Sequence, residues 1–563
     1  MEMEDLNIVI CGAAGQGIKT VEKLLSKMFG RTGHFVFSTK EYMSRVRGGS
    51  NSTDLRVSGR KVRCPVRRVD LLIALDGAAV GHMEKRIDGD TVVVADPDSL
   101  EDRKDLKATL VPVALKELAE EAGAEVYSNT VAAGVAAGGS GLDREACEDV
   151  VKAFFKEHGE EAVQGNLEAF GKGYGSGEEL DLGRSITPGE VEGQLLLSGG
   201  TAVGLGALAG GLRFICSYPM SPSTAVLVFL AQNARKFGLV VEQAEDEISA
   251  VNMGLGAWYT GARSMVTTSG GGLALMSEGI SLSGMVETPL VLHVAQRPGP
   301  ATGLPTRTAQ EDLELVLHAG HGEFPRIILA PGSLEEAFSL TARAFMLAEK
   351  HQVPVFILTD QHLIDSFYHV PELSTEDIST GRFLAEAEEG YRRYTLEGDS
   401  PPPMAVPGSG KGLVCLDSDE HDQAGHITED LDLRVKMVDR RLGKMRKITE
   451  DVLEPELTGE GSHLVICWGS TGNACLEAID ILGRDDVALL RVSQPYPLSG
   501  RVSEIMEEAD TVITVEGNAT GQFGRLLRDL TGVTPDGEIL RYDGLPFRAD
   551  TLAEDIASQL EGR

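Results

Sequence analysis

The chain of 563 residues is too long for a single hydrophobic core, because single cores stop growing at about 250–300 residues. Hydrophobic residues make up 42% and charged residues 25% of the chain, and these ordinary values exclude a wholly disordered or fibrous protein. The 52 basic and 86 acidic residues give a formal charge of −34, and no run of Lys and Arg could follow a phosphate backbone, so we expect no nucleic-acid partner.

Cysteine spacing and the N-terminal sequence predict a reduced, cytoplasmic protein. The seven cysteines are scattered without a C-x-x-C pair, which does not favour iron–sulfur ligation by this chain. Acidic residues precede the first apolar run, whereas a signal peptide begins with basic ones. Residues 195–212 lack charge over 18 positions, the length of a candidate membrane span. Six of the 18 are glycine, so we expect a buried helix there and no membrane association.

The N-terminal region begins with a strand–loop–helix pattern. Residues 5–11 predict a buried strand, residues 12–17 form the loop GAAGQG, and apolar residues at helical spacing follow. Short apolar runs at 71–75 and 91–95 then alternate with helical stretches, which predicts a parallel, doubly wound sheet up to about residue 170. The glycine- and acid-rich stretch that follows predicts a linker.

Two more α/β patterns follow. The first begins near residue 187, and its predicted strands are residues 213–217, 240–242, 264–268, 290–294, 326–329 and 353–358. A charged, proline-rich stretch then predicts a connecting segment with one helix around residues 429–448. The second pattern runs from 462 to the end, with strands predicted at 464–468, 487–492 and 511–515.

The GAAGQG loop is the first candidate site. Glycines such as Gly15 and Gly17 let backbone amides approach an anion at a helix N-terminus. The order G-x-x-G-x-G is not the dinucleotide fingerprint, and Asp70 and Asp76 lie far beyond the ~20 residues at which that fingerprint places its acid. An anion or phosphate contact, a structural turn and a dinucleotide site all remain open.

Residues 44–50 form a second glycine-containing segment, which carries Arg45 and Arg47. Their two guanidinium groups could bind phosphate. A surface turn explains the same residues, so both interpretations are kept.

The central region places polar residues after its first two strands. The loop from Tyr218 to Thr224 offers hydroxyl groups on a proline-stiffened backbone, where open α/β sheets bind ligands. Four acids lie where the next strand turns into a helix: Glu242, Glu245, Asp246 and Glu247. Capping and the helix dipole explain most of them, so at most one is expected to act on a ligand.

A further loop, residues 296–308, carries Arg297 and Thr306 between prolines and glycines that fix its backbone. A rigid guanidinium beside hydroxyl groups suits a carboxylate ligand. A purely structural loop is the alternative.

Several of these segments together resemble one protein family. The run Tyr218-Pro-Met-Ser-Pro-Ser, the acid-rich segment from Gln243 to Ile248, the Arg297 loop and His321-Gly-Glu-Phe-Pro325 resemble the α subunit of the 2-oxoacid:ferredoxin oxidoreductases. The N-terminal third resembles the γ subunit of the same enzymes, fused ahead of α, and residues 516–524 also match the α subunit. The resemblance covers nearly the whole chain in the family's order.

The resemblance implies an α/β fold with three doubly wound α/β domains. These are an N-terminal γ-type domain, a thiamine-pyrimidine-binding domain and a transketolase C-terminal-like domain. The expected boundaries are 1–170 for the γ-type domain, 171–186 for a linker, 187–385 for the pyrimidine-binding domain, 386–455 for the connecting segment and 456–563 for the last domain.

The family cleaves a 2-oxoacid with thiamine diphosphate, passes electrons through iron–sulfur clusters to ferredoxin, and transfers the acyl group to coenzyme A. A glutamate activates the thiamine in these enzymes, so the resemblance implies a catalytic, cofactor-binding role for Glu247, with Glu245 as the second candidate. Tyr218 and Pro219 are then expected to lie against the cofactor.

For the substrate, the resemblance implies that Ser221, Arg297 and Thr306 bind the 2-oxoacid. Coenzyme A or another anion is expected near Gly15, Gly17, Arg45 and Arg47. We expect 2-oxoglutarate as substrate, and its distal carboxylate would need a further cation. Arg263, Arg307 and a residue of another subunit are the candidates that the sequence leaves open.

The diphosphate-binding loop of the family's β subunit and a cysteine cluster are both missing from this sequence. We therefore expect a separate β subunit that carries Mg²⁺ and a [4Fe-4S] cluster, ferredoxin as electron acceptor, and a dimer of heterodimers. The alternatives are a subunit of a non-oxidative thiamine diphosphate enzyme, such as a transketolase or decarboxylase, and a non-enzymatic nucleotide-binding or assembly protein.

Overall fold

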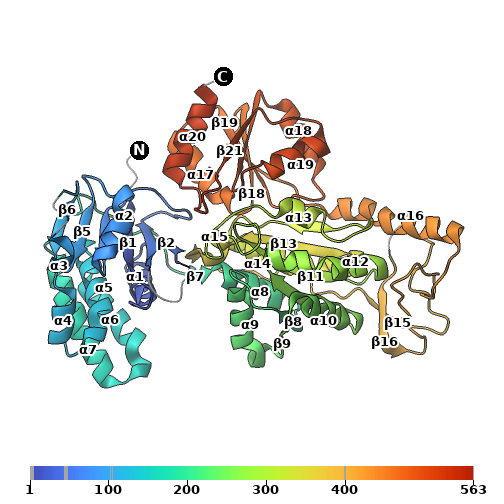
Figure 1. Ribbon diagram of the computed structural model, residues 1–563, viewed down its shortest axis with the longest axis horizontal. Coiled ribbons are helices and arrows are strands. Elements are labelled where there is room, and N and C mark those ends of the chain that lie inside the picture. The colour runs from blue at the N-terminus through green and yellow to red at the C-terminus, as the bar shows by residue number, and fades with distance from the viewer. Residues whose placement is uncertain (1–4, 44–48, 102, 104, 399–400, 562–563) are drawn as a thin grey trace. The chain divides into compact units, whose positions relative to one another are not determined.

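The structure is a computed structural model that describes residues 5–43, 49–101, 103, 105–398 and 401–561 (Figure 1). The chain forms two compact units. Unit 1 comprises residues 1–197, 366–372 and 548–551, and unit 2 comprises residues 198–365, 373–547 and 552–563. The finer five-part division of the chain stays a prediction.

Unit 1 is built on an eight-stranded sheet with the order β6-β5-β4-β1-β3-β2-β14-β7. Its strands are β1 Asp5–Ala13, β2 Phe35–Glu41, β3 Ser50–Ser58, β4 Leu71–Ala74, β5 Val92–Ala95, β6 Thr109–Pro112, β7 Leu195–Ser198 and β14 Phe367–Val370. The three strands predicted in this region, at 5–11, 71–75 and 91–95, are confirmed as β1, β4 and β5.

The prediction of an all-parallel sheet for this region is wrong. The strands β1, β4, β5 and β6 are parallel neighbours, but β3 runs antiparallel to both β1 and β2. Only residues 42–49 connect β2 to β3, and so short a connection permits an antiparallel hairpin but no parallel crossover. Polar residues interrupt both strands, so neither forms the short apolar run used to find the others.

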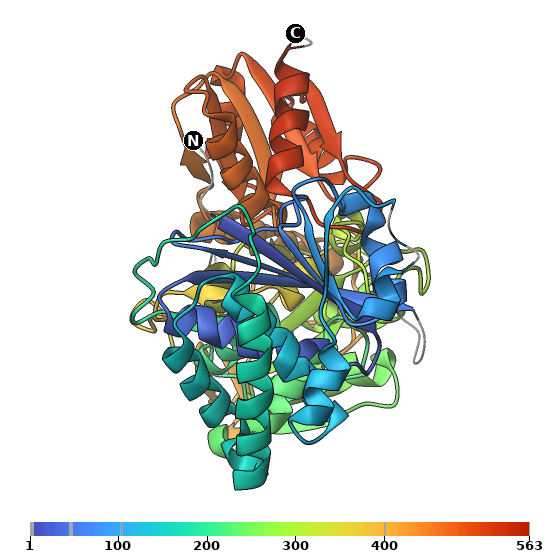
Figure 2. The same cartoon turned by 90° about the vertical axis from the view of Figure 1, so that its left-hand side faces the viewer.

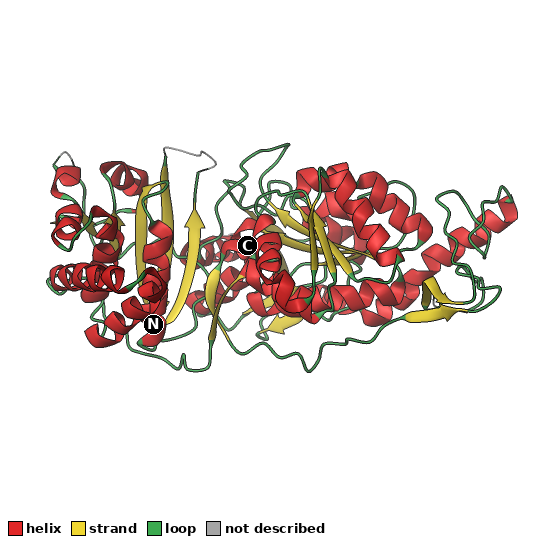
Figure 3. Ribbon diagram, turned by 90° about the horizontal axis from the view of Figure 1, so that it is seen from below, coloured by secondary structure: helices red, strands yellow, loops and turns green. Residues whose placement is uncertain are grey.

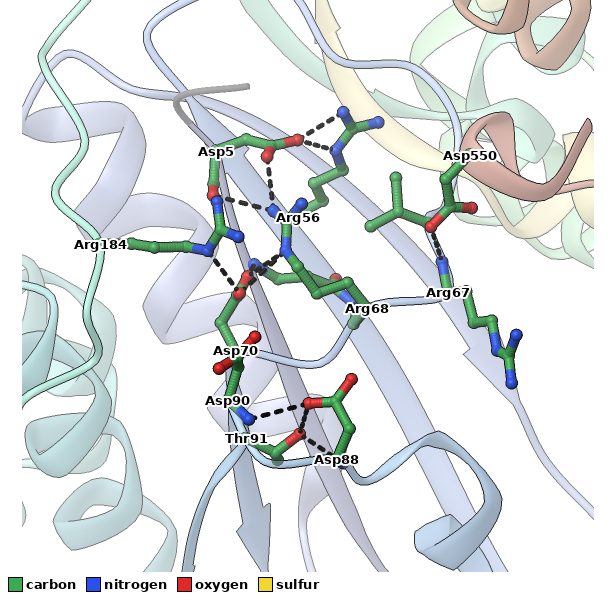
Figure 4. Close-up of polar contacts among 12 residues, drawn as sticks. Asp5, Arg56, Arg67, Arg68, Asp70, Asp88, Asp90, Thr91, Arg184 and Asp550 are labelled. Carbon is green, nitrogen blue, oxygen red and sulfur yellow. Dashed lines mark hydrogen bonds and ion pairs between the residues drawn. The ribbon is translucent and has the colours of Figure 1, made fainter. Parts of the chain in front are cut away.

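A buried ion-pair cluster joins β1 to β3 and to the start of β4 (Figure 4). Arg56 of β3 pairs with Asp5 of β1, and Arg68 also contacts Asp5 at 2.5 Å. Arg68 further pairs with Asp70 at 2.8 Å. These contacts explain how charged side chains can be buried in this sheet, because each buried charge has an opposite partner.

Helices cover both faces of this sheet, and Figure 2 turns unit 1 toward the viewer. They are α1 Ile18–Arg31, α2 Gly77–Met83, α3 Pro97–Leu100, α4 Leu115–Glu121, α5 Ser128–Gly139, α6 Arg144–Phe155 and α7 Glu160–Gly177. The helix predicted after the GAAGQG loop is confirmed as α1, which buries the predicted apolar residues Ile18, Val21, Leu24, Leu25 and Met28.

Helix α7 continues to Gly177 and so extends into the first part of the segment 171–186, for which a linker was predicted. Its glycines allow close packing against α5: a Cβ at Gly173 would lie 2.1 Å from the carbonyl oxygen of Val131. After the helix, Arg184 binds Asp70 at 3.0 Å (Figure 4). Glycines that suggest flexibility in the sequence therefore form a tight helix contact.

Unit 2 contains a six-stranded parallel sheet with the order β12-β13-β11-β10-β8-β9. The strands are β8 Phe214–Ser217, β9 Val240–Gln243, β10 Ser264–Thr268, β11 Leu290–Gln296, β12 Ile327–Leu329 and β13 Pro354–Asp360, and all six were predicted. The helices of this part are α8 Gly199–Ala209, α9 Thr224–Phe237, α10 Glu247–Tyr259, α11 Gly270–Leu275, α12 Ser277–Val286, α13 Leu313–Leu317, α14 Leu334–His351 and α15 Gln361–Asp365.

The order of this sheet reverses between β8 and β10. The chain passes from β8 to β9 at one edge and then returns to the other side of β8 with β10. Loops after parallel strands diverge at such a switch point and leave a crevice for a ligand. A ligand is therefore expected near the segments that follow β8, β9, β10 and β11.

The remaining part of unit 2 holds a second sheet, a small strand pair and a long helix (Figure 3). The second sheet has the order β17-β19-β18-β20-β21, with β17 Glu456–Thr458, β18 His463–Trp468, β19 Val487–Val492, β20 Thr511–Glu516 and β21 Gly537–Leu540. The other elements are β15 Leu384–Ala387, β16 Met404–Gly410, α16 Leu431–Ile448, α17 Thr471–Leu482, α18 Gly500–Glu508, α19 Gln522–Thr531 and α20 Ala549–Glu561. The predicted strands and the helix near 429–448 are confirmed, and one hydrophobic core includes residues of both large sheets.

The uncharged stretch 195–212 forms β7 and the 11-residue helix α8. Within the described ranges, no helix combines the length and apolar character that a membrane crossing requires.

Candidate functional site

Glu247 begins helix α10, directly after the turn that follows β9. Asp246 caps this helix by accepting a hydrogen bond from the Ser249 amide at 2.7 Å. Of the four acids at this turn, Glu242 and Glu245 are exposed, whereas Glu247 is only 3% exposed. Its Oε1 atom is buried and has no hydrogen-bond partner among the described residues. An unpaired buried acceptor is energetically costly, and a ligand that donates a hydrogen bond to Oε1 would remove this cost.

The glycines in the first turn of α11 leave room for the Glu247 side chain. A Cβ at Gly272 would lie 2.8 Å from Oε1 of Glu247 and 2.1 Å from Oγ1 of Thr268. Any residue larger than glycine would therefore displace the carboxylate or the β10 strand end.

Asp312 approaches the same turn, just before α13. A Cβ at Gly270 would lie 2.3 Å from its Oδ1 atom, and its buried Oδ2 has no hydrogen-bond partner in the described ranges. Burial and the neighbouring charge of Glu311 raise the pKa of Asp312 to about 7, although Arg297 opposes the shift. Two carboxyl groups thus flank one glycine-rich turn, each with an unpartnered oxygen.

Arg297 follows β11 and contacts the loop that follows β8. Its Nη1 donates to the carbonyl oxygen of Ser221 at 2.8 Å, so the structure brings together these two predicted residues. Burial lowers the pKa of Arg297, and Asp312 opposes this effect. Gln296 orients the neighbouring segment, because its Oε1 accepts from the Asp312 amide at 3.0 Å.

The other predicted site residues, Tyr218, Pro219 and Thr306, lie on the loops that follow β8 and β11. Tyr218 is 42% exposed and Pro219 is partly buried, both directly after β8. Thr306 is partly buried in the loop after β11, and no hydrogen bond in the described ranges joins it to Arg297. The structure therefore places all three near strand ends without linking them into a single contact.

Arg263 does not belong to this site. It lies at the opposite end of β10, where it is 1% exposed and binds Glu349 at 2.7 Å and the Gly210 carbonyl at 2.8 Å. The candidate role of Arg263 in binding a distal carboxylate is therefore wrong, because its donors hold the fold together.

Residues 516–524 connect the second sheet to the Asp312 segment. The Gln310 amide donates to the Gly517 carbonyl oxygen at 2.7 Å, and the Gly517 amide donates to the side-chain Oε1 of Gln310 at 2.8 Å. The Asn518 side chain donates to the Gln310 carbonyl oxygen at 3.0 Å. Gln522 accepts from the Glu314 amide at 3.0 Å and donates to the Glu311 carbonyl at 2.7 Å. This motif therefore fixes the segment that carries Asp312.

The GAAGQG loop lines a separate cavity of about 360 Å³ in unit 1. Gly15, Gln16, Lys116, Ser128 and Asn129 are among its lining residues. A Cβ at position 17 would lie 2.1 Å from Nδ2 of Asn129, so the loop requires glycine there. No side chain caps the N-terminus of α1, which leaves backbone amides for an anion. Arg45 and Arg47 lie outside the described residues.

The structure argues against a dinucleotide site, because Asp70 and Asp76, the acids considered as ribose ligands, have other partners. Asp76 accepts from the amides of Ala13 and Ala79 at 2.9 Å, and Asp70 belongs to the ion-pair cluster of Figure 4. Both carboxylates therefore stabilise the fold.

Sequence reasoning missed Asp312 and the glycine turn at 270–272. A lone acid before a short helix carries no periodic signal, and the three glycines form the first turn of the short helix α11, which the sequence pattern did not reveal. The run of three consecutive glycines directly after a predicted strand was the available signal, because it permits a close approach.

Comparison with known proteins gives two family matches. Residues 205–440 match the thiamine-diphosphate-binding domain of the pyruvate flavodoxin/ferredoxin oxidoreductases. Residues 7–176 match the family described as pyruvate ferredoxin/flavodoxin oxidoreductase. The fold and both matches define the class of protein as an oxidoreductase with a thiamine-diphosphate-binding domain.

Full-length relatives narrow this class. The chain is 31% identical to a 2-oxoacid:ferredoxin oxidoreductase subunit alpha of Sulfolobus sp over 98% of its own length and 96% of the relative's. It is 26% identical to a 2-oxoglutarate oxidoreductase subunit of Mycobacterium tuberculosis, over 100% of this chain and 92% of that one. A solved 2-oxoglutarate:ferredoxin oxidoreductase from Magnetococcus marinus, with 2-oxoglutarate, coenzyme A and succinyl-CoA bound, matches with a TM-score of 0.93 and 31% identity, covering 99% of this chain and 100% of that one. The chain belongs to the 2-oxoacid:ferredoxin oxidoreductase family, and the relatives that it matches over almost its whole length are α subunits of these enzymes.

Proposed function

We propose that this chain is the γ-fused α subunit of a 2-oxoglutarate:ferredoxin oxidoreductase that works with a separate β subunit. The reaction would convert 2-oxoglutarate and coenzyme A to the acyl-CoA and carbon dioxide while ferredoxin is reduced. The observation that carries this proposal is the buried, unpartnered Oε1 of Glu247 at the switch point of a parallel sheet.

The residues around Glu247 fit the pyrimidine ring of thiamine diphosphate. The bound cofactor would supply an electron sink for the carbanion that decarboxylation leaves. Glu247 would accept a hydrogen bond from a ring nitrogen at Oε1, and Tyr218 and Pro219 would flank the ring from the loop after β8. Because Glu247 lies in a dry position, its carboxylate can hold or release a proton without competition from water.

Arg297 would bind the carboxylate next to the keto group of the substrate. Its Nη1 is engaged by the Ser221 carbonyl, which fixes the guanidinium and leaves its other donors for the ligand. Ser221 and Thr306 would add hydroxyl groups from the two adjoining loops. A planar guanidinium held in this way both binds and orients the scissile bond.

The preference for 2-oxoglutarate is supported by the Magnetococcus structure and by relatives named for this substrate. With Arg263 excluded, Arg307 or a β-subunit residue would bind the distal carboxylate. Coenzyme A would use the unit 1 cavity, where Gly15 and Gly17 present backbone amides, with Arg45 and Arg47 as further candidates.

Exposed apolar side chains support a partner subunit. They lie on the loops and helices that carry the site: Tyr218 at 42%, Ile248 at 50%, Met253 at 41%, Leu275 at 55% and Leu304 at 52% exposure. Such a group on a soluble chain marks a protein contact. We assign the diphosphate site, Mg²⁺ and the [4Fe-4S] cluster to this β subunit, with two heterodimers in the assembly.

Reconstitution tests the proposal. The chain and its β subunit, with thiamine diphosphate, Mg²⁺, coenzyme A and ferredoxin, should reduce ferredoxin with 2-oxoglutarate at least about tenfold faster than with pyruvate, expressed as kcat/KM. Decarboxylation without ferredoxin reduction would instead indicate a non-oxidative thiamine enzyme. A tenfold preference for pyruvate would refute the substrate assignment alone.

A further inference from the structure

A cavity of about 400 Å³ lies between helix α16 and four residues that precede it, Thr395, Leu396, Gly398 and Pro401. Four of its described lining residues are basic and one is acidic; they are Lys436, Arg440, Lys444, Arg446 and Asp439. The chain as a whole carries a formal charge of −34. The charge of this cavity is thus opposite to that of the molecule, and its volume lies within the ~300–1,000 Å³ of small-molecule sites.

The inner side of this cavity is built around one carboxylate. Glu287 ends helix α12 with a left-handed backbone, φ 49°, and is 2% exposed. It forms ion pairs with both Arg440 and Lys444 of α16. One carboxylate therefore serves two cations, of which Lys444 is 4% and Arg440 is 11% exposed.

A third buried cation, Arg393, adds to the excess of positive over negative side chains around Glu287. Arg393 is 2% exposed and donates to the backbone carbonyl of Glu287 at 2.5 Å, not to a carboxylate. Its Nε and Nη1 atoms, and Nη2 of Arg440, are buried without a hydrogen-bond partner in the described ranges. Both guanidinium groups lie over the ring of Tyr394, at 5.4 and 5.7 Å from its centroid.

Two described carboxylates near this cluster do not pair with these cations. Glu420, which is partly buried and precedes α16, is engaged by Arg434 and Arg441, and Asp439 of α16 is exposed. Burial lowers the pKa of Lys444 to about 8, with Glu287 opposing and Arg440 adding to the effect. A surplus of buried cations is unfavourable, because each unpaired ion has lost its hydration, unless an anion binds among them.

We propose that this cavity binds a small multivalent anion, either phosphate-bearing or polycarboxylate. Lys436 and Arg446, which are exposed, would contact the anion from the rim, and Arg440 and Lys444 would contact it from the inner side. The site is distinct from the residues around Glu247 and does not depend on the proposed function.

Calorimetric titration of the full-length chain tests this site with pyrophosphate, citrate and ADP, and with adenosine as an uncharged control. The anions should bind with a Kd at or below about 1 mM that rises with salt, and adenosine should not bind. Binding of ADP alone identifies a nucleotide site, whereas binding of all three anions identifies a general polyanion site. No binding of any anion below about 10 mM would overturn the proposal.

Substitutions locate the bound anion. The double variant Lys436→Glu/Arg446→Glu should raise the Kd at least about tenfold, because it replaces attraction by repulsion at the rim. Lys411→Glu makes the same charge change at an exposed position that does not line the cavity, and it should leave the Kd unchanged. Equal binding by wild type and the double variant would refute the assignment. Asp399 lies outside the described residues; if its carboxylate filled the site, only Asp399→Asn would bind anions, and this result would also overturn the proposal.

Discussion

Replacing Asp312 by asparagine should remove a pH dependence from the stability of unit 2. In the folded chain the pKa of Asp312 is raised from 3.8 to about 7, chiefly by burial. Between these pH values the folded state holds a proton that the unfolded state has lost, so stability falls as pH rises. The slope is about 1.4 kcal/mol per pH unit, and the full loss is about 4 kcal/mol by pH 7. Below pH 3.8 the two states hold this proton equally.

Urea unfolding followed by tryptophan fluorescence measures this effect. Both tryptophans of the chain, Trp258 and Trp468, are buried in unit 2 and report on it directly. The difference in unfolding free energy between Asp312→Asn and wild type should increase by about 2–3 kcal/mol from pH 5 to pH 7. The exposed Asp485→Asn in the same unit is the control and should follow the wild-type profile. A constant difference between Asp312→Asn and wild type would refute the reasoning.

Three further substitutions test other contacts. Arg297→Ala should lower kcat/KM for the 2-oxoacid about 10- to 100-fold, with kcat reduced as well, and unchanged kinetics would remove this residue from the pocket. Gly272→Ala should abolish most activity while the circular dichroism spectrum stays native, because the added methyl group would clash with the Glu247 side chain. Gly256→Ala is the matched control, because a methyl group at this position of α10 would meet no other atom of the described residues. Glu349→Gln should cost about 3 kcal/mol in urea unfolding by leaving Arg263 unpaired, and a cost below about 1 kcal/mol would contradict a buried ion pair there.

The regular parts of the fold could be predicted from sequence because they produce periodic signals. Buried parallel strands form short apolar runs, and all six strands of the central sheet were found in this way. The hairpin of β2 and β3 could not be found, because Arg56 and Asp54 lie within it and obtain their partners only from the tertiary structure. The glycines of α7 misled the prediction for a similar reason, since helix packing and flexibility produce the same composition.

Site residues that belong to a sequence motif could be predicted. Site residues that are defined only by their burial or by the residues around them in the folded chain could not. Glu247 could be separated from Glu245 only by burial, which the structure supplies. The contact of Arg297 with Ser221 joins loops 76 positions apart and follows from the strand order. Asp312 reaches the glycine turn because Gln310 and residues 516–524 hold its segment, and no local pattern encodes that arrangement.

The central claim is that Glu247 prepares thiamine for reaction. Hydrogen–deuterium exchange at C2 of thiamine diphosphate, measured by rapid quench and NMR on the complex with the β subunit, tests this claim without any substrate. Glu247→Gln should slow the exchange about 10²- to 10⁴-fold while the complex and its cofactor binding remain intact. An exchange rate in Glu247→Gln equal to that of wild type would contradict the account.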